Sequence, residues 1–214
     1  MMKKEMLVCN LLVFILITFF TIGASQAAIV TLSDFSSDET PAEYLDAAFE
    51  FLVNGSVLTL NVTNTTSEQN AYSINEIYFN AKDNIDGLAL NPAIEGWELI
   101  EDQKADGFGK FGFEVADGVG NDKHMIDQGE MLTFTFDITG TGPFTDFDFI
   151  TLSTIPPGHI QAIAAAKFVG GPEGDGAYGS AIAAVPIPGA LWLLGSGLVS
   201  IVGLRRKNTY YKKS

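Results

Sequence analysis

Histidines and carboxylates are the side chains of this sequence that could carry out acid–base or nucleophilic chemistry. Its two histidines, His124 and His159, both lie in short polar or proline-rich segments that are typical of loops. The sequence has no Gly-x-Ser-x-Gly, Gly-x-x-x-x-Gly-Lys or His-Glu-x-x-His segment. Its 26 acidic residues offer so many pairs that none stands out as a glycosidase pair. We predict that the protein is not an enzyme, with an extracellular hydrolase as the weaker alternative.

Calcium is the cation that the oxygen-rich loops of this sequence could hold. It takes roughly six to eight oxygen ligands, and no loop here has the EF-hand spacing that supplies them. Asx turns between strands explain the same residues, so we predict no cofactor, with calcium as the alternative. Zinc would lack its usual ligands, because the single cysteine is Cys9 and the two histidines are far apart. The candidate calcium ligands are Asp83, Asp86, Asp102, Asp106, Asp117, Asn121 and Asp122.

Aromatic side chains and Asn-x-Ser/Thr sequons raise the question of carbohydrate. Exposed aromatic rings could stack on sugars, which gives a second functional hypothesis, a calcium-assisted carbohydrate-binding or adhesion module. The alternative is that these rings pack in a hydrophobic core. The sequons suit strand–turn segments rich in Asn, Ser and Thr, and we predict that they are not modified. The aromatic candidates are Tyr72, Tyr78, Trp97 and Tyr178, and the sequons begin at Asn54, Asn61 and Asn64.

The N-terminus has the three parts of a secretory signal peptide. Two lysines precede the apolar run LVCNLLVFILITFF, and the small residues Ser25 and Ala27 stand at −3 and −1 of a cleavage site before Ala28. We predict that signal peptidase removes residues 1–27 by cutting between Ala27 and Ala28. Cys9 leaves with them, so the exported chain has no disulfide. An uncleaved membrane anchor is the alternative.

The C-terminal region has the pattern of a membrane-spanning helix. Residues 187–204 carry no charge, and Arg205 and Arg206 follow directly. A helix of this length is about 27 Å long, close to the roughly 30 Å hydrocarbon core of a bilayer. The basic residues predict that the tail, 208–214, stays in the cytoplasm. The alternative is a buried helix of a soluble protein.

The same region, 185–207, resembles the PEP-CTERM protein-sorting signal. That signal joins a Pro-x-Pro motif, a short membrane span and an Arg-rich end, and the membrane enzyme exosortase recognises and removes it. This sequence departs at Ile187, where the family has glutamate, so a plain C-terminal membrane anchor is the alternative. The resemblance implies a bacterial protein of the cell surface or matrix, associated with exopolysaccharide or biofilm. The matching residues are Val185, Pro186, Ile187, Pro188, Gly195, Gly197, Arg205 and Arg206.

The charge of the region between the two ends excludes one class of partner. Residues 28–184 contain 25 acidic and five basic side chains, a formal charge of −20. Such a surface repels nucleic acid and anionic lipid headgroups. We predict no nucleic-acid partner. The expected partners are signal peptidase, an exosortase-type enzyme, the membrane through the C-terminal helix, and extracellular polysaccharide.

Alternating hydrophobic and polar residues predict an all-β fold. In MLTFTFDI, SVLTLNVT, KFGFEV and DFDFIT (146–151), apolar residues occupy every second position, which is typical of half-buried strands. Turn signals separate the strands, among them Asn54-Gly55, Asp86-Gly87 and Asp106-Gly107. Segment 160–168 could instead form a short helix, because alanine favours helices. Further strands are expected at 28–32, 47–53, 73–79, 97–101 and 160–168.

These strands predict one domain, an antiparallel β-sandwich of jelly-roll or immunoglobulin-like type, over 28–169. A Gly/Ala-rich spacer, 170–184, would join it to the sorting signal. We therefore predict an exported, non-enzymatic surface or matrix protein, held first by its membrane helix and then released or displayed by processing. The predicted core is aromatic: Phe49, Phe51, Phe79, Trp97, Phe111, Phe113, Phe134, Phe136, Phe147 and Phe149.

Overall fold

The computed structural model describes residues 27–32, 35–37, 44–118, 124–154, 160–171 and 177–181. Within them, most strands begin and end close to the predicted positions, because the period-two pattern marks both. The elements are β1 (Ala28–Leu32), β2 (Phe35–Ser36), β3 (Ala47–Asn54), β4 (Val57–Asn64), β5 (Ser73–Phe79), β6 (Ile85–Leu90), β7 (Trp97–Ala105), β8 (Gly109–Asp117), β9 (Met131–Gly140), the 3₁₀ helix η2 (Asp146–Phe149), β10 (Ala164–Val169) and β11 (Ala177–Ala181).

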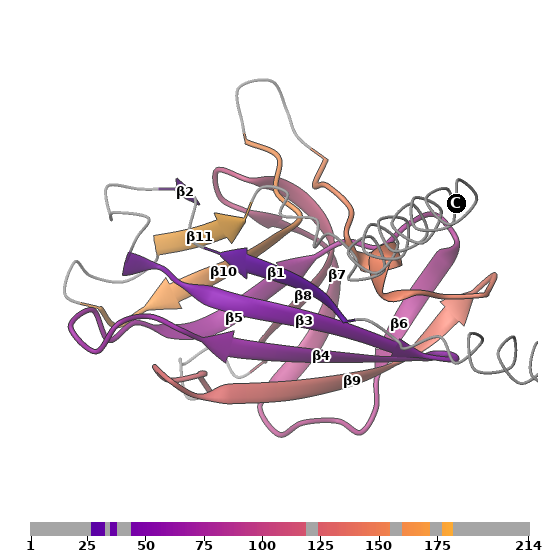
Figure 1. Ribbon diagram of the computed structural model, residues 1–214, viewed down its shortest axis with the longest axis horizontal. Coiled ribbons are helices and arrows are strands. Elements are labelled where there is room, and N and C mark those ends of the chain that lie inside the picture. The colour runs from indigo at the N-terminus through magenta and orange to yellow at the C-terminus, as the bar shows by residue number, and fades with distance from the viewer. Residues whose placement is uncertain are drawn as a thin grey trace, which may run out of the picture.

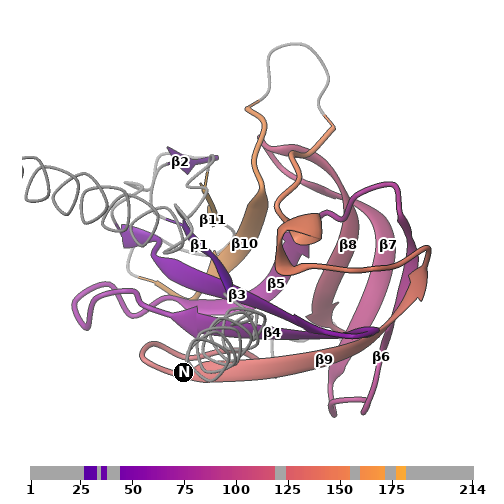
Figure 2. The same ribbon diagram turned by 45° about the vertical axis from the view of Figure 1, so that its right-hand side comes forward.

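The strands form two antiparallel sheets that pack face to face (Figure 1). The first sheet has the order β1-β3-β4-β9-β6, and the second has the order β2-β11-β10-β5-β8-β7. Strands β7 and β8 run at a steep angle to β3, β4 and β9 (Figure 2), as twisted sheets do when they pack. The predicted all-β antiparallel sandwich is confirmed.

Strand β4 shows why the alternation pattern works in this chain. Leu58, Leu60 and Val62 are fully buried between the sheets, while Thr59 and Asn61 lie on the opposite, polar face. Strand β9 repeats the pattern beside it, with Leu60 opposite Phe134. A one-residue slip would expose every one of these apolar side chains, so the pattern also fixes the register.

Aromatic rings fill the space between the sheets. The Phe79 ring lies 5.8 Å from that of Phe51, 5.6 Å from Phe113, 6.0 Å from Phe136 and 6.3 Å from Phe149, measured between centroids. These separations suit stacked and edge-to-face pairs. Of the ten predicted core aromatics, all but Phe147, which is partly exposed, are buried.

A second, smaller hydrophobic cluster covers part of the outer face of the second sheet. Its members are Tyr78, Ala105, Phe108, Phe111, Ala162 and Ala165. We call the connection between η2 and β10, whose described residues are 150–154 and 160–163, the covering loop. Ser153 fixes it, because the Ser153 Oγ donates to the Phe108 carbonyl (2.6 Å) and accepts from the Ala162 amide (3.1 Å). The strand β10 is therefore buried on both faces, and alanines suit a strand with so little room on either side. The helical alternative for this segment is wrong.

The predicted strand at 146–151 is also wrong, because this segment contains η2. The alternation of Asp and Phe in DFDF imitates a strand, but both aspartates are buried rather than solvated. The Asp148 carboxylate accepts from the backbone amide of Thr145 (2.8 Å), which turns the chain into a short helix. Phe149 still reaches the core between the sheets.

Two further strands lie where the sequence predicts turns or a spacer. Asp86 and Gly87, predicted as a turn, belong to β6, and the register of β6 on β9 shifts between Ile85 and Gly87 as in a β-bulge. Strand β11 lies within the predicted spacer, 170–184, and pairs with both β10 and β2. That part of the segment is a strand of the second sheet.

Candidate functional site

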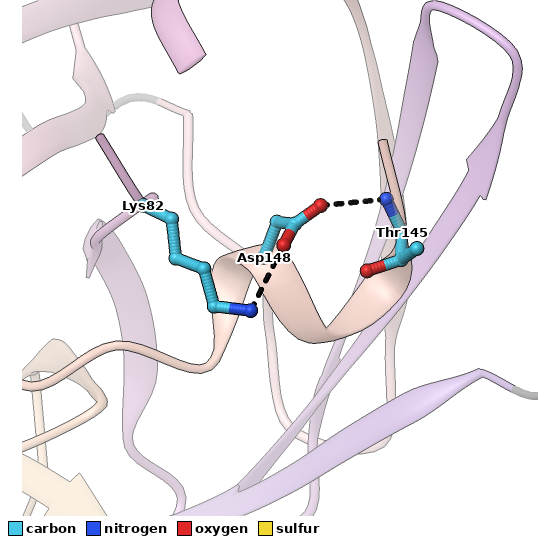
Figure 3. Close-up of polar contacts among 3 residues, drawn as sticks. All are labelled: Lys82, Thr145 and Asp148. Carbon is cyan, nitrogen blue, oxygen red and sulfur yellow. Dashed lines mark hydrogen bonds and ion pairs between the residues drawn. The ribbon is translucent and has the colours of Figure 1, made fainter. Parts of the chain in front are cut away.

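The helix η2 carries the first group of polar contacts that bridges distant parts of the chain. The Lys82 ammonium group donates to the Asp148 carboxylate at 2.9 Å (Figure 3). The Lys82 amide donates to the Asp148 carbonyl, also at 2.9 Å. The neighbouring Asp146 carboxylate accepts from the amide of Val53. Through these contacts η2 joins the end of β3 to the loop after β5. These contacts hold chain segments in place, and both aspartate carboxylates of η2 already accept hydrogen bonds.

Asp148 has an ionised carboxylate at neutral pH. Burial alone would raise its pKa, but the hydrogen bonds from Lys82 and Thr145 outweigh this effect, so the pKa lies below its ordinary value of 3.8. A carboxylate with a lowered pKa in the folded state stabilises the fold at neutral pH. This stabilisation disappears as the pH falls below 3.8 and through the lowered pKa.

We expect Asp148→Ala to lower the free energy of unfolding by about 2 kcal/mol, because the part-buried hydrogen bond from the Thr145 amide is lost together with the ion pair. Lys82→Met should cost under about 1 kcal/mol, since the Lys82 side chain is 52% exposed. Asp83→Ala, an exposed neighbour, is the control. Urea unfolding followed by circular dichroism measures all three. A loss in Lys82→Met as large as in Asp148→Ala would contradict the dominance of the backbone contact.

A second polar group lies on the outer face of the second sheet. The strand register places Ala165, Tyr78, Glu114 and Ile100 in one row and Lys167, Glu76, Ala116 and Glu98 in the next. Lys167 donates to Glu76 Oε1 at 2.8 Å, and the Tyr78 hydroxyl bonds to Glu76 Oε2. The Tyr78 hydroxyl is also hydrogen-bonded to the Glu114 carboxyl. We call Glu76, Tyr78, Glu114 and Lys167 the outer-face network.

Glu114 is the unusual member of the outer-face network. It is only 8% exposed, and burial followed by repulsion from Glu76 raises its pKa from 4.5 to about 7. Tyr78 and Lys167 act in the opposite direction, and Glu98 adds to the increase. A protonated acid beside an ionised one is the arrangement that acid–base enzymes use. Here the Tyr78 hydroxyl occupies the space between the two carboxyl groups, where a glycosidic bond would have to lie.

Of the two histidines predicted to lie in loops, the structure describes only His124. His124 Nδ1 lies 3.3 Å from the Asp117 carboxylate, whose side chain is 4% exposed. The imidazole also packs on Gly96, where a Cβ atom would come within 2.0 Å of Nδ1. Gly96 has a φ of +80°, so both the backbone and the imidazole require glycine there. His159 lies outside the described residues.

The candidate calcium ligands do not come together in the described part of the chain. Asp83 and Asp86 are exposed, and Asp102 pairs with Lys110 at 3.0 Å. Among the described residues, no group of three His, Cys, Asp or Glu side chains could hold a metal ion. Asp117 instead faces His124. The other candidate ligands are Asp106, exposed in the β7–β8 turn, and Asn121 and Asp122, outside the described residues.

Three of the four aromatic rings proposed for sugar stacking are buried. Tyr72 is fully buried, Tyr78 is 2% exposed and Trp97 is 7% exposed. The Trp97 ring packs on Phe134 with centroids 5.3 Å apart. These three residues therefore cannot form a stacking platform, and the alternative that they pack in the core is confirmed. The Tyr178 side chain lies outside the described residues.

The three sequons have different environments. Asn54 is exposed at the β3–β4 turn, and Asn61 lies on the polar face of β4 with its Nδ2 donating to Glu50 Oε2 at 2.8 Å. Asn64 is fully buried and bonded on both sides of its amide group. A glycan on Asn64 is incompatible with the folded sandwich.

The predicted processing residues lie at or beyond the borders of the described residues. Ala27 precedes β1, and Ala28 is its first residue, fully buried opposite Phe51. The sorting residues Val185 to Arg206 lie outside the described ranges. Within those ranges, the structure contains no helix with the length and apolar character of a membrane span.

Comparisons with known proteins find little similarity. No protein-family model matches the chain, and no curated protein does. A similar solved structure is that of an uncharacterized protein from Nocardia farcinica, described as having an immunoglobulin-like fold. It shares 14% identity, covers 58% of this chain and 74% of its own, and has a TM-score of 0.31. A similarity of this size supports no inference about family or function.

Proposed function

We propose that the protein is an exported, non-enzymatic protein of the bacterial cell surface or extracellular matrix, delivered by its PEP-CTERM-like C-terminal signal. Its partners are then signal peptidase, an exosortase-type enzyme and the membrane, and its setting is exopolysaccharide or biofilm. The observation that carries the proposal is that the first and last strands of the sandwich, β1 and β11, have their outer termini at the same end of the molecule.

The register supports this placement of the two termini. Ala28 is opposite Phe51 in the first sheet, and Ala181 is opposite Ala164, which is opposite Phe79, in the second. The rings of Phe51 and Phe79 are 5.8 Å apart, so all these residues belong to one end of the sandwich. This placement suits a precursor whose signal peptide and C-terminal span lie in one membrane, because neither chain end then has to cross the length of the sandwich to reach it.

The distance between the sandwich and the sorting signal is short. Five residues separate Ala181 from the start of the predicted span at Ile187, and at about 3.3–3.6 Å each they reach less than about 20 Å. The anchored precursor would therefore hold the sandwich close to the membrane by this end. The loops before β5 and around His124 would face away from the membrane.

Three buried polar groups of the sandwich support a non-enzymatic role, because each of them joins strands or loops. Asp148 fixes η2, Ser153 fixes the covering loop, and Asn64 joins β4 to its neighbours. In the outer-face network, the Tyr78 hydroxyl lies between the two carboxyl groups. The chemistry of these groups serves the fold.

We also infer that the sandwich is of the jelly-roll type. In a jelly roll, strands from the second half of the chain pair with strands from the first half in reverse order. The pairing of β4 with β9 and of β5 with β8 has this nested order, and β5 also pairs with β10.

Intact-mass measurement of the protein from a bacterium that contains exosortase tests the proposal. We expect a chain that begins at Ala28 and has lost its C-terminal arginines, and a membrane-bound chain that keeps them when exosortase is deleted. The double variant Arg205→Ala, Arg206→Ala should accumulate uncleaved, while Lys212→Ala, Lys213→Ala is the matched control. Retention of the tail with membrane association in every strain would contradict sorting and favour a plain anchor. Full-length protein in the cytosol would contradict export.

A further inference from the structure

The outer-face network contains one hydroxyl proton for two carboxyl groups. Tyr78 has a single O–H, which can be donated to Glu76 or to Glu114 but not to both. Lys167 already donates to Glu76, which marks Glu76 as the ionised acid. The Tyr78 hydroxyl lowers the pKa of Glu114 when it donates to that carboxylate, but it can do so only by giving up its bond to Glu76. A protonated Glu114 donates to the Tyr78 oxygen instead and leaves the bond from Tyr78 to Glu76 in place. With Glu114 protonated, every member of the outer-face network has a hydrogen-bond partner at the same time.

The groups that face Glu114 from the surrounding strands favour the same state. Strand β5 supplies Glu76 and Tyr78, β7 supplies Glu98, and β10 supplies Lys167. The cation is paired with Glu76 at 2.8 Å, so an ionised Glu114 would face Glu76 and Glu98 with little compensation. Only 8% of Glu114 is exposed, so water hydrates an ionised carboxylate poorly at this position.

We propose that Glu114 is the proton-binding residue of a pH-sensitive connection in the second sheet, which holds β10 to β5 and β8 when Glu114 is protonated and weakens when it ionises. The chain of hydrogen bonds runs from Glu114 on β8 through Tyr78 and Glu76 on β5 to Lys167 on β10. Ionisation of Glu114 leaves two carboxylates around one hydroxyl. Strand β11 is joined to this sheet by β10, so both C-terminal strands loosen together.

The direction of the pH effect follows from the pKa of Glu114. A carboxyl whose pKa is about 7 in the folded state and 4.5 in the unfolded state binds its proton more tightly when the protein is folded. Stability therefore decreases as the pH rises from 4.5 to 7, opposite to the effect of Asp148. Between pH 5.5 and pH 8 the folding equilibrium constant should fall roughly 30-fold, about 2 kcal/mol.

Urea unfolding of the full-length protein in mild detergent at the two pH values tests the proposal. We expect the wild type to lose roughly 30-fold in its folding constant, and Glu114→Gln to lose less than about 3-fold, because glutamine keeps a donor for Tyr78 and cannot ionise. Glu101→Gln, an exposed acid on β7, is the matched control and should keep the wild-type pH dependence.

A direct titration makes the result independent of how well the variants fold. The side-chain carboxyl carbon of Glu114, followed by NMR in the wild type, should titrate with a midpoint near 7. In the wild type, the hydrogen-exchange rates of the β10 backbone amides, corrected for intrinsic exchange, should be higher at pH 8 than at pH 5.5. In Glu114→Gln the corrected rates should be the same at the two pH values. A midpoint near 4.5, or the same pH dependence in Glu114→Gln and the wild type, would overturn the proposal.

Discussion

Asn64→Ala is expected to lower the free energy of unfolding by about 3 kcal/mol, measured by urea denaturation of the full-length protein in mild detergent. Asn64 is the last residue of β4 and is fully buried. Its Nδ2 donates to the carbonyl oxygens of Tyr72 (2.7 Å) and Ile126 (2.9 Å). Its Oδ1 accepts from the Thr66 amide (3.1 Å) and hydroxyl (2.8 Å). One side chain therefore joins β4 to the segments before β5 and before β9.

The size of this loss depends on what each partner keeps. In the variant, the single Thr66 hydroxyl proton that is donated to Asn64 in the wild type can turn to the Tyr72 carbonyl, 3.3 Å away. The Ile126 carbonyl still accepts from the Ile74 amide at 3.0 Å. The Thr66 amide loses its partner, which costs about 1–3 kcal/mol for a buried donor, and each other lost bond costs roughly 1 kcal/mol. Asn64→Asp should cost a similar amount without making a cavity, because a carboxylate cannot donate to the two carbonyls.

Asn61→Ala is the matched control, because Asn61 is on the same strand and also begins a sequon. Its side chain lies on the polar face, where Nδ2 donates to Glu50 Oε2 (2.8 Å) and Oδ1 accepts from Thr133 (2.8 Å). Water can replace both contacts, so the loss should stay under about 1 kcal/mol. Equal losses at Asn61 and Asn64 would show that burial of the Asn64 contacts is not what stabilises the fold.

The strands could be predicted from the sequence because burial between two sheets acts on alternate residues. In β4 and β9 one face packs in the core and the other carries Thr and Asn, so period and burial agree. The pattern leaves two readings open where both faces are covered, as in β10, which is predicted as a strand but whose alanines also suit a helix. It fails at 146–151, because a buried aspartate that accepts hydrogen bonds looks, in the sequence, like a solvated one.

The outer-face network could not be predicted, because it depends on how three strands align. The segment KFGFEV places Glu114 on a polar strand face, which normally means solvent. Only the register of β8 and β10 on β5 brings Glu114, Tyr78 and Lys167 together, and the packing around them leaves Glu114 only 8% exposed. The one sequence feature that points to such a network is the small number of basic residues. Of the five basic residues between 28 and 184, Lys82 and Lys167 each hold a buried or half-buried carboxylate.

Phe79 occupies the centre of the aromatic core and connects the two sheets with η2. Its side chain is fully buried, and its ring contacts Phe51 and Phe136 of the first sheet, Phe113 of its own sheet and Phe149 of η2. A cavity at this position would be lined by four rigid rings, which interdigitate and have little freedom to move into it. The surrounding structure can therefore relax less than it could around flexible aliphatic side chains.

Phe79→Ala is expected to lower the free energy of unfolding by about 4–5 kcal/mol, at the upper end for such substitutions, and Phe79→Leu by about half as much. Phe147→Ala is the control, because Phe147 is partly exposed at the edge of the same core and should cost roughly 1–2 kcal/mol. Thermal unfolding monitored by near-ultraviolet circular dichroism, with urea titrations of the same proteins, measures the series. If Phe79→Ala and Phe147→Ala lose the same stability, the rings do not pack as one core, and the two sheets are held together elsewhere.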